Sequence, residues 1–125
     1  MIVIYFDILY VLVLDIFIGI SRPNLDPTVN YCMRDCTDGW FMYTGNGALC
    51  GNGKFFDNAA GPYTQGDRVG VLLDLDDGSL RFFKNGVQHG PDYAAGSVTG
   101  PVVAAVQMLT TGESVRLLPN AQLPQ

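Results

Sequence analysis

The chain has 125 residues, of which 48% are hydrophobic and 15% are charged, a composition that argues against intrinsic disorder and fits a single domain. Twelve acidic residues against seven basic ones give a net charge of -5, and no cluster of Lys or Arg occurs, so nucleic acid is not expected as a partner. The single histidine, His89, also excludes His-rich metal sites.

The first twenty residues are apolar except at Asp7, Asp15 and Gly19, so this segment is long enough to cross a bilayer. It has no basic region before it and no small-residue cleavage site after it, and therefore does not fit a secretory signal peptide. Its many β-branched and aromatic residues favour buried strands instead. Residues 1–17 are accordingly predicted to be either edge strands or a hydrophobic anchor.

The three cysteines follow no disulfide spacing. Cys32, Cys36 and Cys50 together with His89 have the chemistry of a four-ligand zinc site. Structural zinc sites usually pair their ligands as two close clips, however, and the second clip is absent here. We therefore expect reduced thiols with no metal and no cofactor. The sequence contains no Asn-x-Ser/Thr glycosylation site, and we expect a cytoplasmic protein.

From Gly39 onward, short β segments alternate with turns roughly every ten residues, and no stretch has helical spacing of its apolar residues. Tight turns are predicted at Asp76–Gly78 and Asn85–Gly86, where Gly supplies a positive φ. The predicted strands in this part of the chain are Val69–Leu75, Ser79–Lys84, a third one that begins at Val87, Val102–Met108 and Ser114–Leu118. The pattern predicts one all-β domain with the rhythm of a β-sandwich.

Three motifs resemble catalytic or ligand-binding sites but lack residues that those sites need. Gly47–Lys54 is rich in glycine like a phosphate-binding loop, yet Ala48 stands where Gly is required and Phe55 where Ser or Thr is required. Asp74–Gly78 resembles the start of a calcium loop without its later ligands. A Ser-His-Asp triad would have to use His89, and no serine lies in a Gly-x-Ser-x-Gly turn. We therefore do not expect an enzyme.

Most aromatic residues lie within or beside the predicted strands, and we expect them to pack in the core. These residues are Trp40, Phe41, Tyr43, Phe55, Phe56, Phe82 and Phe83. Tyr31 differs because it lies in a loop among polar turn residues. An exposed loop aromatic beside polar groups is typical of a peptide-binding patch.

The segment from Gly66 to Gly86, GDRVGVLLDLDDGSLRFFKNG, resembles the hallmark of the SPRY domain family. The resemblance extends over Ile18 to Leu118, and Tyr5–Ile8 is similar to the family's YFEV strand. Shorter segments that follow in the family's order are Ile18–Ile20, Asp38–Trp40, Tyr43–Gly47, Gly100–Val103 and Gly112–Leu117. The family usually has one or more strands before YFEV. We therefore expect either an incomplete N-terminal edge or a fragment of a longer product.

This resemblance implies a bent antiparallel β-sandwich of the concanavalin type, with very little helix, over residues 1–119, followed by a tail over residues 120–125. It also implies a non-catalytic module that binds a partner protein or extended peptide through loops at the edge of the sandwich, as in adaptors and substrate-recognition domains of ubiquitin ligases. The implied contact residues are Arg22, Asn24, Tyr31, Val106, Gln107, Met108 and Thr110. Because Gln107 stands where those adaptors tend to carry Trp, their peptide specificity is not expected here.

The net negative charge favours a neutral or basic partner segment, mainly through the association rate, and we expect a monomer. Two other functions remain open from the sequence. One is a membrane-tethered β-domain anchored by residues 1–20. The other is a hydrolase that uses His89.

Overall fold

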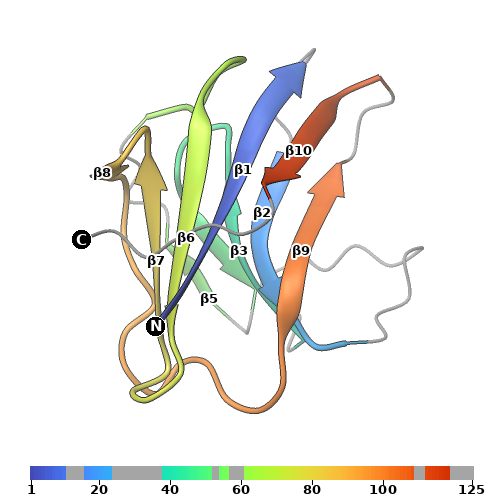
Figure 1. Ribbon diagram of the computed structural model, residues 1–125. Helices are drawn as coiled ribbons and strands as arrows, with labels where there is room; N and C mark the ends of the chain where they lie inside the picture. The colour runs from blue at the N-terminus through green and yellow to red at the C-terminus, as the bar shows by residue number, and fades with distance from the viewer. Residues whose placement is uncertain (11–15, 24–37, 52–53, 57–60, 109–111, 119–125) are drawn as a thin grey trace.

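The computed structural model describes residues 1–10, 16–23, 38–51, 54–56, 61–108 and 112–118. These residues form ten strands (Figure 1). Their bounds are Ile2–Tyr10 (β1), Ile16–Ser21 (β2), Gly39–Tyr43 (β3), Leu49–Gly51 (β4), Lys54–Phe56 (β5), Arg68–Asp74 (β6), Ser79–Lys84 (β7), Val87–Gln88 (β8), Val103–Met108 (β9) and Ser114–Leu118 (β10). None of the described residues is helical.

The strands form two five-stranded sheets that face each other (Figure 1). Sheet A has the order β10-β1-β6-β7-β8, and sheet B has the order β5-β4-β3-β2-β9. Every pairing is antiparallel. This arrangement confirms the predicted all-β sandwich.

The apolar N-terminal segment contributes one inner strand to each sheet. β1 pairs with β10 and β6, and β2 pairs with β3 and β9, so neither strand lies at an edge. Phe6 and Ile8 on β1 and Ile18 on β2 are at most 2% exposed. Among the described residues, no helix is long and apolar enough to span a membrane. The hydrophobicity of this segment is thus explained by strands that are covered on one face by the opposite sheet.

The β6–β7–β8 meander closely follows the turns predicted from the sequence. Gly78 has a φ of 76° in the turn between β6 and β7, where its N–H donates to the carbonyl of Asp74 over 2.8 Å. Asn85 and Gly86 have φ values of 51° and 87° in the next turn. Positive φ at both central residues is the type I′ geometry that joins twisted strands tightly. The Asn-Gly and Asp-Gly signals therefore fix the register of this half of sheet A.

The core lies between the two sheets. Along a strand, side chains that point into the core alternate with side chains on the outer face of the sheet. Trp40 and Phe82 are buried in it, as predicted. The expectation that Tyr43 and Phe83 also belong to the core is wrong, because both are only partly buried on the outer faces of their strands. Phe41 is 2% exposed but is absent from this core cluster. Side chains two residues apart share a face of a strand, so Phe41 and Tyr43 lie opposite Trp40 and Met42.

Candidate functional site

Arg22 follows the last residue of β2, and its guanidinium is bound within the domain. Nη1 donates to the carbonyl oxygens of Thr99 and Pro101, and Nη2 donates to Oγ1 of Thr99 over 3.2 Å. The guanidinium carbon also lies 4.9 Å from the centroid of the Trp40 ring. Trp40 in turn donates from Nε1 to the carbonyl of Ser97 over 2.9 Å. Arg22 and Trp40 therefore fasten the segment before β9 to sheet B.

The three predicted contact residues on β9 differ in environment. Val106 packs against the core, because its position on β9 pairs with Ile18 and points between the sheets. Gln107 pairs with Phe17 and lies on the opposite, outer face of sheet B. Met108, at the end of the strand, is 43% exposed. Of these three residues, Met108 is thus the most exposed, and Gln107 is the one on the outer face of sheet B.

The structure does not bring Arg22 and Met108 together. Ser21 pairs with Val103, whereas Met108 pairs with Ile16 at the other end of the same two strands. Six extended residues span roughly 17 Å, so one small contact surface does not include both ends. The remaining predicted contacts, Asn24, Tyr31 and Thr110, lie outside the described residues.

Two aromatic residues that the sequence analysis did not place at the site share the outer face of sheet B with Gln107: Phe17 pairs with Gln107, and Tyr43 pairs with Phe17. Phe17 stacks on Tyr43, with ring centroids 5.0 Å apart and an angle of 25° between the ring planes. Gly45 supports this arrangement, because a Cβ atom there would overlap the Tyr43 ring. Phe17, Tyr43 and Gln107 share the outer face of sheet B, whereas Met108, which follows Gln107 at the exposed end of β9, pairs with the inward-pointing Ile16. We call these four residues, on the outer face and at the adjoining strand end, the Phe17 patch. Alternation along β2 could have identified Phe17, since Ile16, Ile18 and Ile20 all point inward.

The side chain of His89 makes contacts within the domain. Its Nε2 atom lies 2.8 Å from the carbonyl oxygen of Gly61, and its ring meets the Tyr63 ring edge-on at 4.8 Å. Cys50 is buried and free. In the described part of the chain, no three His, Cys, Asp or Glu side chains are grouped so that they could hold a metal ion. Cys32 and Cys36, the other members of the zinc set considered above, lie outside that part.

Asp67 is the centre of a hydrogen-bond network at the end of the β7–β8 hairpin. Its carboxylate accepts from Asn85 Nδ2 over 2.9 Å and from the Thr64 N–H over 2.7 Å, and it lies 3.7 Å from Lys84 Nζ. Desolvation raises the pKa of Asp67, but these hydrogen bonds and the charge on Lys84 outweigh it and hold the pKa below its usual value. The network therefore fixes the loop before β6.

The sequence matches the SPRY domain family over residues 14–121. The chain belongs to the SPRY domain family. Two solved structures share its fold: the SPRY domain of human HERC1, with 21% identity and a TM-score of 0.77, and another human SPRY domain, with 23% identity and a TM-score of 0.74. They match 96% and 97% of this chain, which spans 76% and 78% of theirs.

A further similar structure is that of stonustoxin, with 18% identity and a TM-score of 0.63. It matches 93% of this chain, which spans 20% of the stonustoxin chain. A search of curated protein sequences found no match. At these identities the structural likenesses establish the fold, and family membership rests on the sequence match.

SPRY domains are generally protein–protein interaction modules. Within this SPRY domain, the predicted contact residues fall into three groups. Arg22 and Val106 stabilise the domain itself, Gln107 and Met108 belong to the Phe17 patch, and three further residues lie outside the described part. The patch is therefore the part of the predicted site that has a defined geometry.

Proposed function

We propose that this SPRY domain binds an extended peptide segment of a partner protein through the Phe17 patch and the adjoining loops at the edge of the sandwich. The stacking of Phe17 on Tyr43 carries this proposal, together with the adjoining end of β9, where Met108 is 43% exposed. Aromatic rings held in place offer a large apolar contact area with little loss of side-chain entropy on binding. Methionine adapts its shape to a partner surface.

Gln107 gives this surface its polar component. An amide side chain both donates and accepts hydrogen bonds, and it lies next to the ring of Phe17 in the paired strands. A backbone peptide group presents the same two functions, so the patch can contact an extended main chain as well as its apolar side chains. The net charge of -5 favours a neutral or basic segment during the approach to the domain.

A quantitative affinity pull-down with the full chain, read by mass spectrometry, tests the proposal. Phe17→Ala combined with Met108→Ala should reduce the recovery of specific partners by about tenfold or more, as expected when apolar anchors are truncated. Tyr31→Ala combined with Met108→Ala should have a similar effect. The matched control is Leu75→Ala combined with Val87→Ala, which truncates apolar residues that are 53% and 71% exposed and lie outside the patch.

Circular dichroism must show that each variant remains folded. Equal recovery of the same partners by the wild type and both patch variants would contradict the proposal. An equal loss in the control variant would also contradict it, because the loss would then not depend on the patch.

A further inference from the structure

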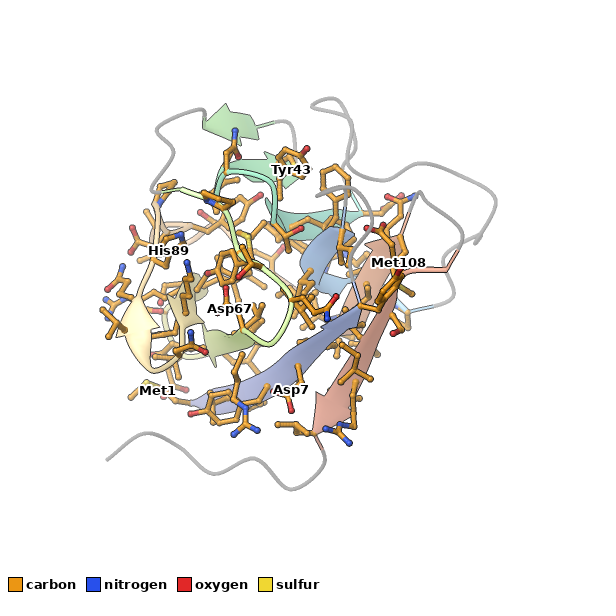
Figure 2. All side chains as sticks on the ribbon, turned by 90° about the horizontal axis from the view of Figure 1, so that it is seen from above. Met1, Asp7, Tyr43, Asp67, His89 and Met108 are labelled. Atoms are coloured by element: carbon orange, nitrogen blue, oxygen red, sulfur yellow. The ribbon has the colours of Figure 1, made fainter. Side chains whose placement is uncertain are left out.

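A second surface with a defined geometry lies on the outer face of sheet A, away from the Phe17 patch. It is a pocket of about 680 Å³ that is lined by residues of β1, β6 and β10 and by the turn after β7. Figure 2 shows Asp7, a residue of this pocket, on the side of β1 that faces away from the opposite sheet. SPRY domains generally bind proteins, but this general property does not identify the ligand of this pocket.

Asp7 lies between two arginines from the neighbouring strands. It pairs with Arg68 on β6 and with Arg116 on β10 in the sheet register. Arg68 donates from Nε over 2.8 Å and from Nη2 over 3.2 Å to the two carboxylate oxygens. Nη2 of Arg116 lies farther away, 3.6 Å from Oδ2. One carboxylate is therefore shared unequally between two guanidinium groups.

The pocket thus carries an excess of positive charge on a chain that is negative as a whole. The hydrogen bond from Arg68 holds the pKa of Asp7 below its usual value, so Asp7 is ionised at neutral pH. One negative and two positive side chains leave a net charge of +1. Within the described residues, Asp7 is the only ion-pair partner of Arg116, whose side chain is 61% exposed. Most of the donors of Arg116 therefore face solvent.

Apolar groups lie beside these charges. The ring of Tyr5 lies 5.9 Å from the guanidinium carbon of Arg68, and Leu9, which also lines the pocket, is 43% exposed. The rim is open, since a Cβ atom built on Gly66 or Gly86 would contact nothing within 4 Å. The pocket can therefore accept a side chain from outside without a change in the backbone.

We propose that this pocket is a second interaction surface, which binds a Glu or Asp side chain of an acidic partner segment through Arg116. Apolar side chains next to that residue in the partner segment pack against Leu9 and Tyr5. The planar guanidinium fork matches a carboxylate and forms two parallel hydrogen bonds to it. The negative charge of the whole chain slows the approach of an acidic segment, whereas the local excess of positive charge stabilises it once bound. The inference does not depend on the Phe17 patch.

An NMR titration of the isotope-labelled full chain tests this inference. The probe is the capped peptide acetyl-Leu-Glu-Leu-Glu-Leu-amide, and its Gln counterpart is the matched ligand. The Glu peptide should produce saturable shifts of backbone amides around Asp7 and Arg116, and the Gln peptide should bind about tenfold more weakly because it lacks the charge. High salt should weaken the binding of the Glu peptide.

Arg116→Gln should reduce the affinity for the Glu peptide by about tenfold. Arg81→Gln should leave the affinity for the Glu peptide unchanged. Arg81 is also about half exposed on sheet A but lies outside this pocket. The inference is overturned if the Glu peptide causes no shifts, if both peptides bind equally, or if the two variants behave alike. It is also overturned if free acetate at the same carboxylate concentration reproduces the shifts and the affinity, since the pocket would then bind a simple anion.

Discussion

The guanidinium group of Arg22 lies 4.9 Å above the indole ring of Trp40 and is hydrogen-bonded to Thr99, a residue that is far away in the sequence. Arg22 is thereby committed to holding the segment before β9 against sheet B. Gly100 allows this contact, because a Cβ atom there would lie 2.7 Å from Nη1 of Arg22. Arg22, which the family resemblance implies as a partner contact, is thus also engaged in holding the fold together.

We therefore predict that Arg22→Ala lowers stability rather than abolishing partner binding directly. Loss of the charged hydrogen bonds and of the contact with Trp40 should cost about 1–3 kcal/mol in the free energy of unfolding. Urea denaturation measures this change, with Arg81→Ala as an exposed arginine control that should change stability little. If Arg22→Ala leaves the urea midpoint unchanged and still eliminates partner capture, Arg22 is a contact residue after all.

The two buried tyrosines of the core should respond oppositely to loss of the hydroxyl group. Tyr93 donates to the carbonyl of Cys50 over 2.9 Å, whereas the hydroxyl of Tyr63 is buried without a hydrogen-bond partner in the described part of the chain. Burial, with the charge of Asp67, raises the pKa of Tyr63, so its hydroxyl stays protonated. Tyr63→Phe should leave the free energy of unfolding unchanged or raise it by about 1 kcal/mol. Tyr93→Phe should lower it by about the same amount. Thermal unfolding of both variants measures the contrast, and equal losses would contradict it.

The pair formed by Asp7 and Arg68 predicts a loss of stability in acid. The hydrogen bond from Arg68 lowers the pKa of Asp7 in the folded state, whereas in the unfolded chain it is about 3.9. The stabilisation is therefore complete above the unfolded pKa and is lost as the pH falls through the folded pKa. Asp7→Asn should be less stable than the wild type at neutral pH, and the difference should shrink as the pH falls below about 4.

Urea midpoints measured across this pH range test the prediction. Asp76→Asn, which alters an exposed carboxylate in the β6–β7 turn, is the control. A difference between wild type and Asp7→Asn that stays constant down to acid pH would show that Asp7 does not contribute through its charge.

Gly45→Ala should disturb the Phe17 patch with little effect on the core. The added methyl group would overlap the Tyr43 ring, which must then move away from Phe17. Overpacking of this kind costs about 1–3 kcal/mol, and the cost should lie near the lower limit because the Tyr43 ring is partly exposed. Near-ultraviolet circular dichroism reports the altered aromatic environment, and the pull-down described above reports partner recovery. An unchanged spectrum together with unchanged recovery would contradict the role given to Tyr43.

Much of the fold could be predicted because local signals agreed with one another. The Asp-Gly and Asn-Gly turns set the bounds of β7, which match the prediction, and the β-branched N-terminal segment forms β1 and β2. The position of those two strands inside the sheets could not be predicted. Strand order depends on contacts between distant parts of the chain, such as the pairing of β1 with β10.

The candidate site was harder to predict because a sequence pattern does not show where a side chain finds its partners. Arg22 resembles a surface contact, yet its acceptors are 77 and 79 residues away in the chain. Val106 and Gln107 are adjacent in sequence but point to opposite faces of sheet B. Tyr43 was expected in the core because aromatic composition alone does not distinguish the two faces of a strand.

Site-specific photo-crosslinking shows whether a partner protein contacts the Phe17 patch. A benzoyl-phenylalanine group replaces either Met108 in the Phe17 patch or Val87 on β8, two exposed apolar positions in different sheets. Partner proteins recovered with the full chain should be crosslinked at position 108 and not at position 87. Crosslinking of the same partners at position 87, with none at position 108, would contradict it.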